Sequence, residues 1–157
     1  MALMIGRSWT HYRGGLMFID ASAIVAIIKA EPEAAGFLKA IETRQTKIFC
    51  SPVARFEAVA SLAVQLAMVR GRQHIDREDQ EAAEGLVADF LAEIGARDIH
   101  ITEGMGAAAR SAALAYGKAS GHPAGLNMGD CFAYACAKAY HVPLLYSGSG
   151  FQQTDLE

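Results

Sequence analysis

Short apolar runs alternate along the chain with longer segments in which apolar residues recur every three or four positions. The short runs have the composition of buried strands, and they lie at about residues 16–19, 48–50, 99–101 and 143–146. The longer segments have the spacing of amphipathic helices, and they cover about residues 22–30, 31–42, 52–69, 76–94, 103–118 and 127–140. Strands that alternate with helices favour a parallel sheet with helical crossovers. The pattern therefore predicts a small three-layer α/β/α domain with a mainly parallel sheet of four or five strands.

The composition fits one compact soluble domain. With 157 residues, of which 52% are hydrophobic and 20% charged, the chain can bury a substantial core. No apolar run reaches the roughly 18 to 20 residues of a membrane span, so we expect a soluble protein with no membrane partner. The cysteines lack metal-ligand spacing and are odd in number, which favours a reducing cytoplasm over a disulfide framework; they are Cys50, Cys131 and Cys136.

Residues 1–16 precede the domain and contain no continuous apolar stretch of the kind found in signal peptides. We interpret them as an N-terminal extension or leader, and residues 17–157 as the domain itself. Met17 is an alternative start.

The charge is unevenly distributed. The formal net charge is −3, from 14 basic and 17 acidic residues, but seven of the acids lie within residues 76–93 beside a single base. The rest of the chain has 13 bases and 10 acids, a net charge of +3. Because local clustering decides whether a polyanion can bind, the overall charge does not exclude a nucleic-acid substrate.

The first candidate for chemistry is Asp20, which lies where the first strand gives way to the first helix. Open α/β sheets bind their ligands at the carboxyl ends of the strands. An Asp two residues before Ser22 is also good helix-capping chemistry. Asp20 by itself therefore does not distinguish a ligand from a cap.

Two further acids lie near predicted strand ends. Glu57 is on the apolar face of its helix, where an unpaired carboxylate is costly; either a base such as Arg55 or Arg110 neutralises it, or it faces a cation. Asp130 lies in the first turn of the last helix, where the helix dipole stabilises an acid by roughly 0.3 to 1 kcal/mol. Three acids on three elements favour a site for Mg²⁺ or Mn²⁺, which prefer oxygen ligands. The matching chemistry is metal-assisted hydrolysis of a phosphodiester.

Four segments carry a family resemblance: Met-Phe-Ile-Asp-Ala-Ser-Ala at 17–23, Ser-Pro-Val at 51–53 with Glu57 after it, Gly-His-Pro-Ala-Gly-Leu-Asn-Met-Gly-Asp-Cys-Phe-Ala-Tyr-Ala at 121–135, and Pro-Leu-Leu-Tyr at 143–146. In this order they resemble the PIN-domain ribonuclease toxins of bacterial VapBC type II toxin–antitoxin systems. The third segment is the most specific.

The resemblance implies a PIN-like fold and a Mg²⁺-dependent endoribonuclease, with Mn²⁺ as an alternative metal, restrained by a cognate VapB-type antitoxin. Asp20, Glu57 and Asp130 match the catalytic, metal-binding acids of the family, and Ser22 matches the hydroxyl residue beside the first acid. Water activated by the metal would attack an RNA phosphate in line. The resemblance further implies a homodimer that contacts operator DNA only through the antitoxin.

The chain departs from the family after the last strand. The family reads close to Lys-Gly-Asn-Asp-Phe there, whereas this chain reads Ser-Gly-Ser-Gly-Phe at 147–151, with Gly150 in place of the fourth acid. Fewer carboxylates attract fewer cations, so we expect one-metal occupancy or weaker affinity. Asp155 is a candidate substitute ligand, with a solvated tail residue as the alternative, and Ser149 is a candidate for holding a metal-bound water.

The missing acid also supports an alternative function, a catalytically impaired PIN-like module that binds antitoxin or RNA without cleaving. The apolar face of the helix at residues 52–69, with the helix at 76–94, is the candidate surface for antitoxin or dimer contact. Five bases are candidates for the RNA track; they are Arg55, Arg70, Arg72, Arg110 and Lys118.

Overall fold

The computed structural model describes residues 15–42 and 47–156. All but the last two positions of the predicted extension lie outside these ranges, and Leu16 already belongs to the first strand. The elements follow the predicted alternation: β1 (Leu16–Ile19), α1 (Ala21–Ile28), α2 (Ala34–Glu42), β2 (Lys47–Cys50), α3 (Pro52–Val69), α4 (Arg77–Glu93), β3 (Arg97–Asp98), α5 (Glu103–Tyr116), the short 3-10 helix η2 (Lys118–Ser120), α6 (Met128–Tyr140), β4 (Leu144–Leu145) and the 3-10 helix η3 (Gly150–Gln153).

The described residues form one parallel sheet of four strands in the order β3-β2-β1-β4. Phe18 in the central strand β1 pairs with Phe49 on one side and Leu144 on the other. Since parallel strands end at the same edge of a sheet, Asp20 after β1 and Ser51 after β2 leave the sheet side by side. We call this edge the carboxyl edge.

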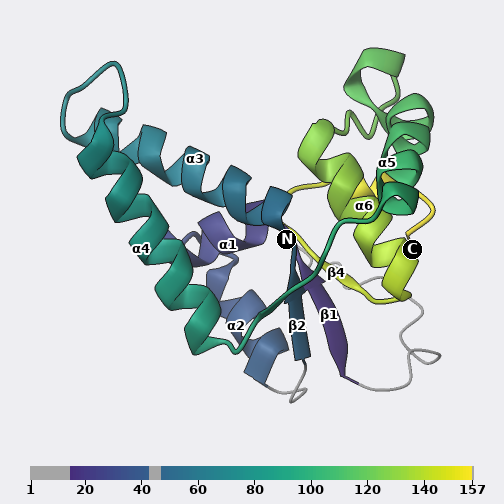
Figure 1. The fold of residues 1–157 in the computed structure, drawn as a ribbon, viewed down its shortest axis with the longest axis horizontal. Helices are drawn as coiled ribbons and strands as arrows, with labels where there is room; N and C mark the ends of the chain where they lie inside the picture. Colours follow the sequence, from purple (N-terminus) through teal and green to yellow (C-terminus); the bar gives the residue numbers. More distant parts are fainter. Residues whose placement is uncertain (1–14, 43–46, 157) are drawn as a thin grey trace.

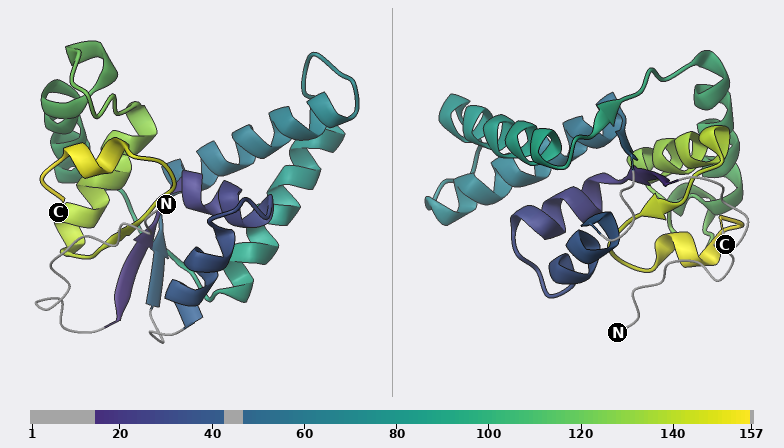
Figure 2. Two further views of the ribbon diagram at one scale, coloured as in Figure 1. Left: turned by 180° about the vertical axis from the view of Figure 1, so that it is seen from behind. Right: turned by 90° about the horizontal axis from the view of Figure 1, so that it is seen from below.

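The helices lie on both sides of the sheet, which confirms the predicted three-layer α/β/α architecture. Figure 1 shows α3 and α4 as a long pair that leans away from the sheet, and α5 packed against α6 on the other side. The views in Figure 2 place α1 and α2 on the same side as the α3–α4 pair. The core between these layers is apolar, and Phe18, Ile19 and Ile24 are fully buried.

Two predicted elements differ most from the structure, while the other boundaries agree to within about two residues. The third strand covers Arg97–Asp98 rather than 99–101. Ile99 is buried and its N–H still donates to the carbonyl of Cys50, but β2 ends there because the chain turns into α3, so no partner continues the pairing. The apolar pattern that predicted a strand at 99–101 thus reflects the burial of Ile99 and not strand pairing. Helix α2 begins at Ala34 instead of residue 31, since residues 31–33 form a turn.

The outer face of α3 is unusually apolar. Phe56 is 69% exposed, and Val64, Met68 and Val69 are exposed beyond it. By length and composition alone α3 could cross a membrane, a test that the core helix of a soluble protein also passes. Its inner face packs on α4 and α1, which accounts for part of its apolar character.

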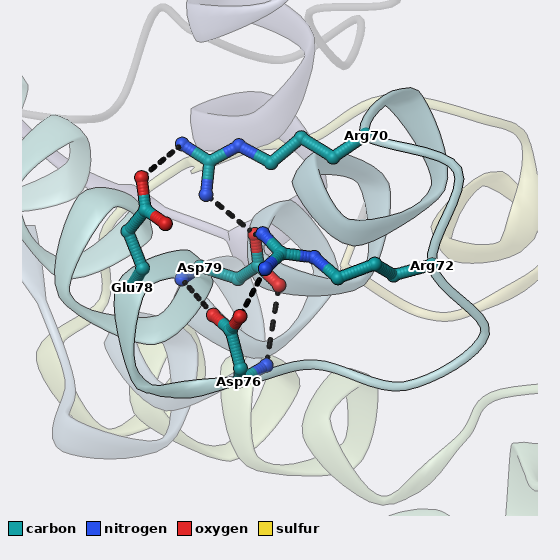
Figure 3. A network of polar contacts seen from close by, with 5 residues as sticks. All are labelled: Arg70, Arg72, Asp76, Glu78 and Asp79. Carbon is teal, nitrogen blue, oxygen red and sulfur yellow. Dashed lines mark hydrogen bonds and ion pairs between the residues drawn. The ribbon is translucent and has the colours of Figure 1, made fainter.

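A charged network fixes the turn between α3 and α4 (Figure 3). The carboxylate of Asp79 is fully buried and accepts hydrogen bonds from Arg70 and Arg72, each at 2.8 Å. The same carboxylate accepts the backbone N–H of Asp76 at 3.2 Å, and Asp76 caps α4 by accepting the N–H of Asp79. Arg70 also pairs with exposed Glu78 at 3.3 Å. Because the buried Asp79 carboxylate accepts several hydrogen bonds, two of them charge-assisted, we expect these contacts to stabilise the turn.

We expect Asp79→Ala to lower the free energy of unfolding by about 2 to 4 kcal/mol, because the substitution removes the shared acceptor of two arginines and half of a capping box. Glu78→Ala is the matched control, since it removes a pair that is largely in water, and we expect a change of under about 0.5 kcal/mol. Urea unfolding followed by circular dichroism measures both variants. Equal effects would show that the buried carboxylate does not hold the turn.

Candidate active site

Asp20 serves as both cap and buried acid. It is 2% exposed and is the N-cap of α1, where its Oδ2 accepts the backbone N–H of Ser22 at 3.0 Å and the Ser22 hydroxyl at 2.5 Å. Its Oδ1 is buried and has no hydrogen-bond partner among the described residues. A buried oxygen without a partner carries a desolvation cost of about 1 to 3 kcal/mol, and a cation would satisfy it. The capping role therefore explains one oxygen of Asp20 but not the other.

Glu57 lies in the second turn of α3 and is not neutralised by either base that the sequence offers. Arg55 forms its ion pair with Asp98 at 2.9 Å, and Arg110 lies 3.6 Å from Glu103. The carboxylate of Glu57 instead lies against α6, where a Cβ atom at Gly129 would overlap it. Only glycine at this position lets the Glu57 carboxylate approach α6 so closely.

Asp130 shapes the start of α6. Its backbone N–H donates to Oδ1 of Asn127 at 2.9 Å, and its Oδ2 accepts the backbone N–H of Asn127 at 2.9 Å, a reciprocal capping box. This arrangement explains Asn127 beside the acid. The capping hydrogen bond from Asn127 occupies Oδ2, one of the two carboxylate oxygens of Asp130.

The three acids affect one another electrostatically. Burial, together with the charges of Asp20 and Asp130, raises the pKa of Glu57 to about 7. Burial raises the pKa of Asp20 against the opposing hydrogen bonds from Ser22. The pKa of Asp130 is raised by burial and to a smaller extent by Asp20, against the hydrogen bond from Asn127. Three acids that all resist ionisation near one another form a site that a positive charge would stabilise.

The residues fit a small divalent cation. In the described parts of the chain no three His, Cys, Asp or Glu side chains already have the arrangement that holds a metal ion. Two observations nevertheless match such a group: the partnerless Oδ1 of Asp20, and the contact of Glu57 with Gly129 at the start of α6. All of the side chains offer hard oxygen ligands, which suit Mg²⁺ and Mn²⁺.

The other predicted site residues lie in different surroundings. Ser22 contacts Asp20 directly, as described above, whereas Ser149 is exposed and makes no side-chain cap for η3. Asp155 is bound to α6, since its carboxylate accepts the Tyr134 hydroxyl at 2.5 Å and Lys138 at 2.9 Å. Both carboxylate oxygens of Asp155 thus already have partners that tie the C-terminal segment to the domain.

Position 150 has little room for a side chain. A Cβ atom at Gly150 would lie 2.9 Å from the backbone oxygen of Ala124, closer than an ordinary contact. A backbone atom cannot move away as a flexible side chain can. The loop at residues 121–126 therefore packs tightly against residue 150, where the sequence lacks the fourth acid.

Four of the five bases that the sequence offered for an RNA track pair with acids in the described parts of the chain. Arg70 and Arg72 hold the α3–α4 turn, and Arg55 pairs with Asp98. Arg110 pairs with Glu103 at 3.6 Å but is exposed, as is Lys118. These two remain the freer candidates for contact with a phosphate.

The sequence reasoning missed Gly129, Ser147 and Glu33. Only the fold shows that Gly129 makes room for Glu57. Ser147 donates its backbone N–H to the Ser22 hydroxyl and its own hydroxyl to Glu33. No local pattern signals contacts between residues more than 100 positions apart.

The chain is similar to known proteins over most of its length. The sequence profile of the PIN domain matches residues 17–157. The chain therefore belongs to the PIN-domain family.

Three relatives show how far the similarity extends. A VapC ribonuclease of Rhizobium meliloti is 43% identical over 143 residues, covering 90% of this chain and 99% of the relative. A VapC ribonuclease of Mycobacterium bovis is 36% identical, covering 89% of this chain and 95% of the relative. Ribonuclease VapC28 of Mycobacterium tuberculosis is 34% identical, covering 90% and 96%. The likeness thus extends over nearly the whole of each protein. Within the PIN-domain family, the chain therefore belongs to the VapC toxins of toxin–antitoxin systems.

Proposed function

We propose that the protein is a metal-dependent endoribonuclease, the toxin of a type II toxin–antitoxin pair, and that Asp20, Glu57 and Asp130 hold its Mg²⁺ or Mn²⁺. The observation that carries the proposal is the uncompensated charge at the carboxyl edge. Among the described residues, Asp20 has a buried oxygen without a hydrogen-bond partner, and Glu57 has its pKa raised to about 7 beside two other acids. The names of the relatives, which are ribonucleases, point to RNA as the substrate.

Each acid has a distinct part in this proposal. Asp20 offers Oδ1, because Ser22 holds Oδ2. Glu57 reaches the site from α3 over Gly129, and Asp130 offers the oxygen that its capping box leaves free. When bound, the cation supplies Lewis-acid stabilisation of charge on the phosphate and activates water for attack. The protein residues bind the cation and orient it at the edge where strands β1 and β2 end.

The same proposal includes the partners that the resemblance implies. A cognate VapB-type antitoxin restrains the nuclease, operator DNA is contacted through that antitoxin, and the toxin itself is a soluble cytoplasmic homodimer. The exposed apolar residues of α3 offer a surface for antitoxin or dimer contact.

With no acid at residue 150, we expect a single cation or weaker affinity, and activity below that of a four-acid site. Asp155 is the weaker candidate for a substitute, since Tyr134 and Lys138 occupy its carboxylate. Ser149 is exposed and remains a candidate for holding a water molecule.

Cleavage of RNA by the purified chain tests the proposal. We expect cleavage with Mg²⁺ or Mn²⁺, none with EDTA, and recovery when excess metal is added back. Cleavage that persists in EDTA would contradict a metal-dependent site. No cleavage under any condition, with antitoxin binding intact, would favour the silent binding module, which nothing in the fold or the comparisons supports.

Two substitutions at residue 150 distinguish the effect of a tighter packing contact from the effect of an added carboxylate. We expect Gly150→Asp and Gly150→Ala both to lower stability, by about 1 to 3 kcal/mol, because each adds the Cβ atom that meets Ala124. Only the Asp variant adds a carboxylate, so we expect it to bind Mn²⁺ more tightly than the Ala variant. Equal Mn²⁺ affinities in the two variants would show that residue 150 does not face the site.

A further inference from the structure

A chain of hydrogen bonds joins Glu33, in the turn before α2, to the Asp20 carboxylate. The Ser147 hydroxyl donates to Oε1 of Glu33 at 2.6 Å, and the backbone N–H of Ser147 donates to the Ser22 hydroxyl oxygen at 3.0 Å. The Ser22 hydroxyl then donates to Oδ2 of Asp20 at 2.5 Å. These bonds connect the α1–α2 turn, the segment after β4 and the start of α1. Glu33 and Ser147 are therefore linked to an acid that neither of them touches.

The direction of each bond in the chain is fixed. A serine hydroxyl has one hydrogen to donate. Ser22 gives its hydrogen to Asp20, so its oxygen is left to accept the N–H of Ser147. Ser147 gives its hydrogen to Glu33, and this hydrogen bond lowers the pKa of Glu33 and keeps the acceptor charged. The chain of hydrogen bonds thus runs from the charged carboxylate of Glu33 to Oδ2 of Asp20.

The end of the chain determines which oxygen of Asp20 remains available. Oδ2 accepts both the hydroxyl and the backbone N–H of Ser22, whereas Oδ1 is buried and has no hydrogen-bond partner in residues 15–42 and 47–156. If the Ser22 hydroxyl turned away, Oδ2 would keep only the backbone N–H of Ser22, and the Asp20 carboxylate would be held less firmly. Groups that hold a metal ligand in this way set its orientation and basicity, and losing one typically costs 10- to 100-fold in affinity.

We propose that Glu33 and Ser147 are positioning residues, which hold Ser22 in place and so fix the Asp20 carboxylate with Oδ1 toward the cation. The inference rests on the proposed function, because it assigns both residues a role toward the same cation. The backbone N–H of Asp20, directly after β1, donates to the carbonyl of Leu145 in β4 at 3.0 Å. This hydrogen bond brings the segment after β4 close to Ser22 and Asp20.

The proposal gives a role to the segment in which the chain departs from its family. Gly148, directly after Ser147, has φ of +96°, a conformation that favours glycine and turns the chain sharply. Ser147 therefore meets Ser22 and Glu33 at the point where the chain turns away. Without an acid at residue 150, this segment supports the site through hydrogen bonds from Ser147.

The test compares variants that break the chain with variants that preserve it. Ser147→Ala removes the donor to Glu33, and Glu33→Ala removes the acceptor. We expect each to weaken Mn²⁺ affinity about 10-fold, to lower kcat for RNA by a similar factor, and to leave KM for RNA within about two-fold. Because both act through one chain, the double variant should be no worse than either single variant.

Conservative variants and a control complete the design. Ser147→Thr keeps the hydroxyl, and Glu33→Gln keeps an acceptor oxygen, so we expect both to retain most of the affinity. Glu31→Ala removes a nearby acid that pairs with Lys29 at 2.5 Å and lies outside the chain; we expect it to match the wild type. Thermal unfolding of every variant establishes that the fold is kept.

The outcomes separate the two proposals. A wild-type chain that binds no Mn²⁺ and cleaves no RNA would overturn the proposed function and this inference with it. A normal wild type whose Ser147→Ala and Glu33→Ala variants bind Mn²⁺ equally well would overturn this inference alone. Losses that multiply in the double variant would also overturn it, because independent sites behave in that way.

Discussion

Asp20→Asn should abolish RNA cleavage, with a loss of about a thousand-fold or more, since a catalytic cation contributes several kcal/mol to transition-state stabilisation. The asparagine keeps the shape of the side chain and its oxygen can still accept the hydrogen bonds of Ser22. Its NH₂ group would then replace Oδ1, the oxygen that has no partner within the described part of the chain. A hydrogen-bond donor in that place repels a cation. Cleavage of labelled RNA at saturating Mg²⁺ measures the loss.

The same substitution should not unfold the protein. Burial raises the pKa of Asp20, so the folded state binds a proton more readily than the unfolded state does. Above the ordinary pKa of an aspartate, stability therefore falls as the pH rises, and it falls until the pH passes the raised value. A neutral asparagine avoids this cost. In metal-free buffer at pH 8, we expect Asp20→Asn to melt at or above the wild-type temperature.

Two results would contradict this explanation of Asp20. Cleavage at more than a tenth of the wild-type rate would show that the oxygen is not needed, and a large drop in melting temperature would show that the carboxylate of Asp20 stabilises the fold rather than destabilising it. Glu103→Gln is the control, since Glu103 is highly exposed and pairs only loosely with Arg110 at 3.6 Å. We expect it to change neither property.

Gly129→Ala should lower cleavage by about 100-fold while keeping the fold, because a displacement of about 1 Å at a catalytic group can cost that much. The new methyl group would occupy the space of the Glu57 carboxylate. That carboxylate is the end of a flexible side chain, so it can move aside without disturbing the helices. Alanine also favours a helix over glycine by roughly 0.5 to 1 kcal/mol. We therefore expect a less active protein that is no less stable.

Gly85→Ala provides the matched control. Gly85 lies in α4 and has open space where its Cβ atom would be, so we expect the same gain in helix propensity with unchanged cleavage. Kinetics and urea unfolding of both variants test the prediction. Full activity in Gly129→Ala would show that the position of Glu57 against α6 does not matter to the reaction.

The sequence predicted the fold because each element carried its own local signal. Alternating strand and helix patterns gave the parallel sheet, and capping residues such as Ser51, Asp76 and Thr102 mark helix starts in the structure. The third strand was misplaced because burial of Ile99 continues where pairing with β2 has ended. Hydrophobic patterns report burial, whereas the length of a short strand depends on its partner.

The candidate site was predictable only as a set of acids. Asp20, Glu57 and Asp130 stood out because each lies near an element boundary in an apolar context, and their role as metal ligands stays a prediction. The fold adds what sequence spacing does not contain: Arg55 and Arg110 pair elsewhere, and Gly129 admits Glu57. Contacts across long sequence separations depend on how the strands are ordered in the sheet, which local patterns do not specify.

Calorimetric titration of the metal-free protein with Mn²⁺, at pH 6 and pH 8 and in two buffers of different ionisation enthalpy, tests the cation site most directly. The pKa of Glu57 is about 7, so it is mostly protonated at pH 6 and mostly ionised at pH 8. Because a carboxylate must lose its proton to bind a metal, we expect about one proton or more released per ion at pH 6, and less release with tighter binding at pH 8. Asp20→Asn, Glu57→Gln and Asp130→Asn should each abolish this binding. Mn²⁺ affinity that is the same at both pH values and unchanged by all three substitutions would contradict a cation site built from these acids.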